Sequence, residues 1–137
     1  MATRNEGNVD RVRRGIDAFN RGDAEAVLDF FDEDIEIYAS PQLANSGTYH
    51  GHDGYQRWLA EWLDAWDDYT LNVERVEPVG DHHVVAGIRQ TARGKGSGIP
   101  VEMPSAYMFD LSDEGTRAFH LYITWEEAVE VAEERER

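Results

Sequence analysis

The chain has 137 residues, a length that suits one domain with a single hydrophobic core. Thirteen lysines and arginines against 28 aspartates and glutamates give a formal net charge of −15, which opposes binding to nucleic acid and to anionic membrane surfaces. The absence of cysteine excludes disulfides, thiolate catalysis and thiolate metal sites. No apolar run approaches the ~20 residues of a membrane helix, and the N-terminus lacks the apolar centre of a secretory signal. We therefore expect a globular, cytoplasmic protein.

The chain is expected to begin with a flexible segment and two helices. Residues 1–7 are polar and are predicted to be flexible. A first helix then carries apolar residues at helical spacing, namely Val9, Val12, Ile16 and Phe19. The sequence Asn-Arg-Gly at 20–22 ends this pattern, and Asp23 is a suitable N-cap for a short second helix over residues 24–31.

The clearest amphipathic helix of the chain is predicted over residues 51–66. Large apolar side chains recur along one face of it, at Tyr55, Trp58, Leu59, Trp62 and Trp66. Three of the four tryptophans of the chain lie on this stripe, and the opposite face is mostly charged. Such a stripe either packs in the core or lines a wide, concave ligand site, and the sequence is compatible with both interpretations.

The rest of the chain alternates with the period of two that is typical of strands. The predicted strands are residues 35–40, 70–78, 83–92, 101–111 and 117–125, and an irregular alternation in the second of them indicates a bulge. Residues 42–50 are predicted as a loop with a short extended piece, and the glycine-rich residues 94–98 as a hairpin tip. Residues 126–134 form a closing helix that is expected to fray, and residues 133–137 form an acidic tail.

Alternation also assigns a face to each strand residue. The inward set comprises Val84, Ala86, Ile88, Gln90, Val101, Met103, Ser105, Tyr107, Phe109, Leu111, Phe119, Leu121, Ile123 and Trp125. Arg89, Asp110, His120 and Tyr122 are assigned to the outward face. Helices followed by a run of strands predict an α+β domain whose bent antiparallel sheet wraps around the helices.

Several segments resemble the SnoaL-like bacterial branch of the nuclear transport factor 2-like superfamily. The matching pieces are AFNRGDAEAVLDFFDEDIEIYAS, GTYHGHDGYQRWLAEWLDAW, GSGIPVE and WEEAVEVA, so that the resemblance defines a single domain over residues 8–132. It implies a cone-shaped half-barrel, a curved antiparallel or mixed sheet around three N-terminal helices, with a small apolar ligand at its open end and a homodimer formed through the outer sheet face. The superfamily hosts isomerases, cyclases, epoxide hydrolases, dehydratases and non-catalytic binders, so the resemblance leaves the activity open.

Two activities of the superfamily lack their residues here. In its ketosteroid isomerases the base at the end of the first strand corresponds to Ala39, the tyrosine of the first helix to Gly15, and the acidic donor to Tyr107, so that no base remains. Its epoxide hydrolases use two aspartates and an arginine inside the cone, whereas alternation points Asp110 and Arg89 outward. We therefore expect neither reaction.

Polyketide cyclases of the SnoaL type use a pocket carboxylate or histidine as acid and base, and need no metal. Tyr107 is the candidate catalytic residue here, because it is a polar donor at an inward position. The candidate ligand-binding residues are Tyr55, Trp58, Trp62, Gln90, Met103, Ser105, Phe109, Leu121 and Ile123. The open alternatives are a binder of a small apolar or aromatic molecule, a cofactor-free isomerase, cyclase or dehydratase, and a non-catalytic dimerisation module.

The histidines are predicted to have other roles. His120, Tyr122 and Arg89 form an outward patch, predicted as a homodimer interface or as a solvated face. His50 and His52 with Asp53 lack a third good ligand, so we expect no metal and no cofactor. The pair at 82–83 is predicted to be exposed in a turn.

Overall fold

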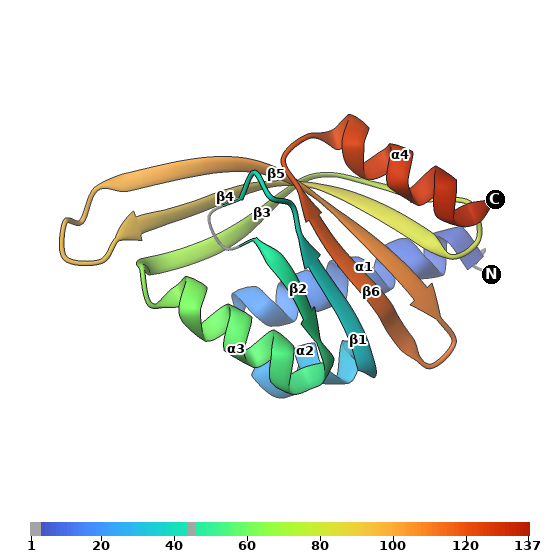
Figure 1. Cartoon of the computed structure of the whole chain (residues 1–137), viewed down its shortest axis with the longest axis horizontal. Helices are drawn as coiled ribbons and strands as arrows, with labels where there is room; N and C mark the ends of the chain where they lie inside the picture. The colour runs from blue at the N-terminus through green and yellow to red at the C-terminus, as the bar shows by residue number, and fades with distance from the viewer. Residues whose placement is uncertain (1–3, 44–45) are drawn as a thin grey trace.

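The computed structural model describes residues 4–43 and 46–137, in which a curved sheet is covered on both faces by helices (Figure 1). The elements are α1 (Arg4–Asn20), α2 (Ala24–Phe30), β1 (Phe31–Ala39), β2 (Gly47–His50), α3 (Gly51–Leu63), β3 (Trp66–Val79), β4 (His83–Gly94), β5 (Pro100–Ser112), β6 (Gly115–Tyr122) and α4 (Trp125–Glu136). Helices α1, α2 and α3 lie against the concave face, and α4 lies on the other (Figure 1). The predicted α+β cone is confirmed. None of the helices in the described ranges is long and apolar enough to cross a membrane.

The strands form one mixed sheet in the order β2-β1-β6-β5-β4-β3. Only the β1–β6 pair is parallel among the described strands, because the first strand inserts beside the last. The register of β3 against β4 shifts between Asp67 and Thr70 and again between Val73 and Arg75, which confirms the predicted irregularity. Strand β2 is the short extended piece expected within residues 42–50, of which residues 44–45 lie outside the described part.

The main core fills the concave side of the sheet, as alternation predicts. Ile35 and Ile37 of β1, together with Val84 and Ile88 of β4, are almost completely buried there. Helix α1 covers them with Val12, which is also fully buried. Burial of this apolar surface is the main driving force for the fold.

Several element boundaries differ from the sequence prediction, and two of them affect the cone. Helix α3 ends at Leu63, so Trp66 begins β3 and pairs with Gly94, instead of continuing the helical stripe. The Trp66 ring still packs on Trp62, with centroids 5.5 Å apart, which explains why its spacing imitates that of the helix. Helix α1 already includes residues 4–7 of the segment expected to be flexible, and residues 1–3 lie outside the described residues.

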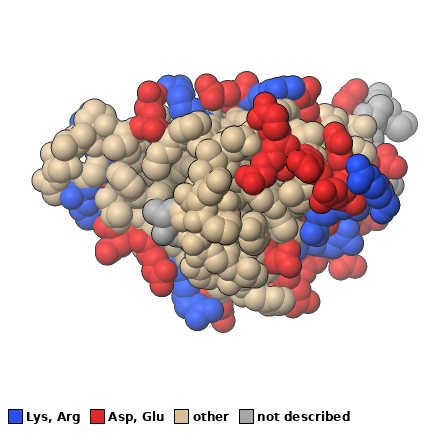
Figure 2. Space-filling model, turned by 45° about the horizontal axis from the view of Figure 1, so that its top comes forward, with Lys and Arg blue, Asp and Glu red and all other residues tan. Residues whose placement is uncertain are grey.

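The closing helix is longer than the sequence predicts, and it includes residues 133–136 of the expected acidic tail. Helix α4 is N-capped by the Thr124 hydroxyl and continues to Glu136, and its Ala128 and Ala132 are fully buried against the outer face of the sheet. Small side chains let the helix approach the sheet closely, so a sparse apolar surface is enough to dock it. Acidic side chains gather on its outward side (Figure 2).

Alternation assigns Trp125 to the inward face of the predicted strand over residues 117–125. In the structure it does not point into the cone. It opens α4 and packs on the outer face over Gly87, where an added Cβ would lie 3.3 Å from the indole. The Arg75 guanidinium lies 4.0 Å from the centre of the same ring, a cation–π contact.

A buried ion network fixes the end of α4 to the sheet. Asp110 of β5 accepts hydrogen bonds from Arg117 and Arg135, both at 2.8 Å, and lies 3.4 Å from His83 Nε2. His83 Nδ1 also contacts the carboxylate of Glu136. His83 is therefore buried, with 3% of its side chain exposed, and the prediction of an exposed turn residue is wrong.

The network makes stability depend on pH. Burial lowers the pKa of His83, but the hydrogen bonds and charges of Asp110 and Glu136 outweigh it, and the net direction is upward. A raised folded-state pKa contributes stability that is complete below the unfolded value of 6.5 and is lost as pH rises through the folded value.

We therefore expect the free energy of unfolding to fall as pH is raised above 6.5, and the substitution His83→Gln to flatten this dependence. Urea denaturation between about pH 6 and pH 9 measures it. His50→Gln, at a histidine whose side chain is 75% exposed, should keep the wild-type dependence. Identical pH profiles for wild type and His83→Gln would contradict this assignment.

Candidate functional site

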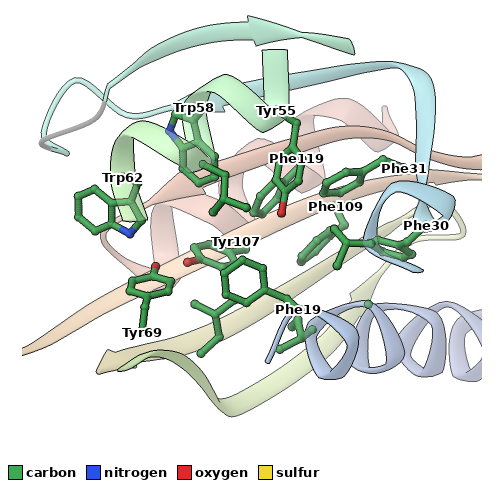
Figure 3. A pocket seen from close by; sticks show the side chains of 15 residues that line it. Phe19, Phe30, Phe31, Tyr55, Trp58, Trp62, Tyr69, Tyr107, Phe109 and Phe119 are labelled. Atoms are coloured by element: carbon green, nitrogen blue, oxygen red, sulfur yellow. The ribbon is translucent and has the colours of Figure 1, made fainter. Parts of the chain in front are cut away.

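The inside of the cone holds a small cavity of about 40 Å³ walled almost entirely by apolar side chains (Figure 3). It is lined by Gly15, Ile16, Phe19, Val27, Phe30, Phe31, Tyr55, Trp58, Leu59, Trp62, Tyr69, Leu71, Tyr107, Phe109 and Phe119. This volume holds a few water molecules, and it is far below the several hundred Å³ typical of sites for drug-sized ligands. The aromatic wall nearly fills the cone.

Aromatic side chains from three walls of the cone meet at Phe119 of β6. Its ring stacks on Phe109 at 5.0 Å and receives the edge of Tyr107 at 5.1 Å and of Trp58 at 6.5 Å. Such stacked and edge-to-face contacts stabilise cores beyond the area they bury. Two predicted ligand-binding residues, Trp58 and Phe109, and the candidate catalytic residue Tyr107 are therefore also core residues.

A second, wider space lies outside the aromatic wall. A groove of about 290 Å³ at the mouth of the cone is lined by Gln42, Leu43, Trp58, Trp62, Tyr69, Gln90, Glu102, Met103, Pro104, Leu121 and Ile123. Trp58, Trp62 and Tyr69 border both spaces and so form the partition between them.

The predicted site residues divide between the two spaces. Tyr55, Trp58, Trp62, Tyr107 and Phe109 line the inner cavity. Gln90, Met103, Leu121 and Ile123 line the mouth groove, together with the two tryptophans. Ser105 lines neither space; its hydroxyl is buried and accepts a hydrogen bond of 2.9 Å from Gln90 Nε2.

A chain of hydrogen bonds crosses the partition. The Tyr69 hydroxyl donates to Gln90 Oε1, and Gln90 donates onward to Ser105. Trp62 and Tyr107 both hydrogen bond to Tyr69, and Figure 3 shows the hydroxyls of Tyr69 and Tyr107 turned toward each other. The polar atoms of an otherwise apolar site therefore converge at one place.

Tyr69 is the functional candidate that the sequence did not reveal. It lies in β3 between Asp67 and Thr70, where the register against β4 shifts, so alternation cannot assign it a face. Its ring packs edge-on against Trp62 at 6.0 Å and against Phe19 at 5.9 Å. These contacts turn it inward.

The phenols of the site are neutral donors at physiological pH. Burial raises the pKa of Tyr107 well above its ordinary value, and it raises the pKa of Tyr69 to about 12 despite the hydrogen bonds from Trp62 and Tyr107. No carboxylate or histidine is among the described residues lining the inner cavity. Glu102 reaches the mouth groove, but its carboxylate is 2.7 Å from Arg89. The site can donate hydrogen bonds, and it has no evident base.

Among its described residues, the cone lacks those that a ketosteroid isomerase or an epoxide hydrolase of this fold would need. Ala39 is buried and cannot titrate, and Gly15 lies so close to Phe30 that an added Cβ would be 2.9 Å from its ring. Asp110 and Arg89 make their ion pairs outside the cone, as alternation predicts. Neither the ketosteroid isomerase nor the epoxide hydrolase arrangement is present in the described part of the cone.

The outward patch is less open than expected. His120 and Tyr122 are buried, and the Tyr38 ring covers them at centroid distances of 5.3 and 5.8 Å. Burial lowers the pKa of His120, although Glu36 opposes the effect, so the ring is neutral. Nε2–H then donates to Glu36 at 2.8 Å, and Nδ1 accepts from the Tyr122 hydroxyl at 3.0 Å.

The remaining histidines have local partners. His52 Nε2 contacts the Phe31 carbonyl at 3.0 Å, and His50 lies 3.9 Å from Asp34. Within residues 4–43 and 46–137, no group of three or more histidine or carboxylate side chains converges as a metal site.

Tyr69→Phe should lower the free energy of unfolding by about 1–2 kcal/mol, because Gln90 Oε1 loses its donor inside a largely apolar wall. Chemical denaturation measures this loss. Tyr49→Phe is the matched control, since the half-buried Tyr49 of β2 has no hydrogen bond among the described residues, and it should change stability by less than about 0.5 kcal/mol. Equal effects of the two substitutions would show that the hydrogen-bond chain contributes nothing.

Solved structures confirm the fold. Bal32a, from a soil-derived mobile gene cassette, has a TM-score of 0.79 at 20% identity, with 92% of this chain and 95% of that chain covered. A putative polyketide cyclase of Xanthomonas campestris pv. campestris gives 0.76 at 20% identity, over 95% and 99% of the two chains. TerC, co-crystallised with polyporic acid, gives 0.75 at 18% identity, over 90% and 98%.

Sequence comparison gives the family. No curated protein matches the chain. A profile of the SnoaL-like domain family matches residues 12–118, which include most of the sheet and every described lining residue of the cavity except Phe119. The chain therefore belongs to the SnoaL-like domain family.

Proposed function

We propose that the cone binds a small, largely apolar or aromatic molecule that carries a hydrogen-bond acceptor. The observation that supports this most directly is the convergence of Tyr69, Tyr107 and Gln90 in a site that is otherwise apolar. A few placed donors in a concave apolar wall are typical of small-molecule sites. The apolar part of the ligand would contact the aromatic rings. Its acceptor atom would accept a hydrogen bond from one of the phenols, in place of an acceptor of the protein.

Binding requires the partition to move, because the inner cavity of about 40 Å³ is too small for an aromatic ligand. Trp62 is the side chain best placed to move: it is only partly buried, it borders both spaces, and α3 ends one residue after it. Its displacement would join the cavity to the mouth groove of about 290 Å³. We therefore propose that the ligand enters past Trp62.

The aromatic wall of the cone and the related structures suggest which small molecules to test first for binding. TerC was co-crystallised with polyporic acid, so this compound is a reasonable first probe for the present chain. A second probe is 2-naphthol, a two-ring aromatic molecule with one hydroxyl. It tests the apolar wall and the phenols with few other groups.

A cofactor-free isomerase, cyclase or dehydratase is the alternative, with Tyr107 as its acid. A neutral buried phenol can stabilise a developing oxyanion by donating a hydrogen bond, and the raised pKa keeps Tyr107 in this neutral form. Proton abstraction needs a base, however, and the described lining of the inner cavity offers no carboxylate or histidine. Binding without catalysis therefore has the stronger support.

If the cone binds these probes, each should quench tryptophan fluorescence and raise the melting temperature, because a ligand that binds only the native state stabilises it. Tyr107→Phe should weaken the affinity about tenfold by removing one donor. Tyr49→Phe, on β2 outside the site, should bind like wild type. If neither probe, and no member of a panel of steroids, terpenoids and fatty acids, changes the tryptophan fluorescence or the melting temperature, the binding proposal is contradicted.

The homodimer through the outer sheet face remains a prediction. Of its predicted residues, Arg89 is the one with substantial exposure, and it pairs with Glu102 and Glu74. Arg89→Glu would place three carboxylates together there, and it should shift a dimer to monomer in sedimentation velocity. If the wild-type protein sediments as a monomer, or if the variant still sediments as a dimer, the prediction is wrong.

A further inference from the structure

A charged groove of about 1130 Å³ lies at the end of the molecule opposite the β4–β5 hairpin tip (Figure 1). It runs between α1, the β3–β4 turn, the β5–β6 turn and the end of α4. None of its described lining residues is shared with the cavity or the mouth groove of the cone. Arg11, Arg14, Arg117 and Arg135 line it, a concentration of arginines in a chain that has 13 lysines and arginines and a net charge of −15.

The best-buried carboxylates of this groove are already occupied. Asp110 accepts one hydrogen bond on each oxygen, from Arg117 and from Arg135. Glu136 accepts from the backbone N–H groups of Asp81 and His82, at 3.3 and 3.0 Å, and contacts His83 as well. Two further carboxylates, Asp81 and Asp113, are exposed at the rim. The acceptor capacity inside the groove is therefore largely used.

The donor capacity of the arginines is only partly used. Arg117 and Arg135 each hydrogen bond through one nitrogen, with 54% and 36% of their side chains exposed. A guanidinium has five N–H donors, so most of theirs remain free for a ligand. Arg11 makes one long hydrogen bond, of 3.5 Å, to Asn8, and Arg14 has no hydrogen bond or ion pair among the described residues.

Arg11 and Arg14 also repel each other. They lie three residues apart on α1 and so share a face of the helix. Burial lowers the pKa of Arg11, the charge of Asp113 opposes this effect, and the charge of Arg14 makes a smaller contribution that lowers the pKa again. The two guanidiniums have more positive charge between them than this nearby carboxylate balances.

We propose that this groove binds a small molecule through an oxyanion group, a phosphate or a carboxylate, held by Arg11 and Arg14 with the free donors of Arg117 and Arg135. Planar guanidiniums match both anions in geometry and form strong, charge-assisted hydrogen bonds with them. The anion would relieve the repulsion within α1 and join it to the β5–β6 turn and to α4. This site is independent of the ligand proposed for the cone.

Inorganic phosphate and citrate are the probes, titrated by calorimetry and by amide chemical shifts against sodium chloride of equal ionic strength. We expect saturable binding of at least one of them, with shifts at residues 81–83 and 110–117. Arg14→Ala should weaken it about tenfold, because it removes one charge-assisted contact. Arg57→Ala, at an exposed arginine of α3 outside the groove, should bind like wild type. The stronger of the two probes identifies the anion as phosphate or carboxylate.

Arg11→Ala is a second variant, and it should also weaken binding. Unchanged melting curves of the variants without anion would show that α1 stays folded. No saturable binding of either probe would overturn the proposal, as would binding that Arg14→Ala and Arg11→Ala leave at wild-type strength.

Discussion

The packing of Phe119 against aromatic side chains from neighbouring elements is the interaction on which the cone depends. Its ring lies within 5.8 Å of Phe31 on β1 and 5.0 Å of Phe109 on β5, and it meets Trp58 of α3 at a right angle. These contacts join a parallel neighbour, an antiparallel neighbour and the covering helix. The same rings hold the fold together and line the cavity, so the volume left for a ligand is small. Stability and binding therefore compete for the same side chains.

Helix α4 makes a second, separate core on the outer face. It buries Met108 and Val85, so that the middle of the sheet is covered on both sides. The ion network of Asp110 and Glu136 then fixes the end of this helix beside α1. An apolar cone and a charged groove thus occupy different ends of one sheet, and neither shares a described lining residue with the other.

Much of the cone could be predicted from the sequence, because its signals are local. Alternation in β4 and β5 depends on side chains that point to opposite faces, and the helical stripe gave Tyr55, Trp58 and Trp62 correctly. Local signals fail where the backbone departs from its period. Tyr69 follows a register shift, and Trp66 lies just beyond the end of α3 at a spacing that still imitates a helix.

The remaining features that the sequence did not predict depend on contacts between residues far apart in the chain. The burial of His83 depends on Glu136, which is 53 residues away, and the docking of α4 depends on alanines whose small size matters only against a sheet. A single sequence contains no signal for such contacts. The small size of the cavity is likewise a property of rings from seven elements packed together, which no single motif encodes.

If a ligand opens the cone by displacing Trp62, fluorine NMR of protein labelled with 5-fluorotryptophan will detect the movement. The Trp62 resonance is assigned by its loss in Trp62→Phe, and the Trp125 resonance reports the outer face under α4. With 2-naphthol added, we expect a large shift or exchange broadening of the Trp62 resonance and an unchanged Trp125 resonance. A Trp62 resonance that saturating 2-naphthol leaves in place would show that the ligand does not displace Trp62.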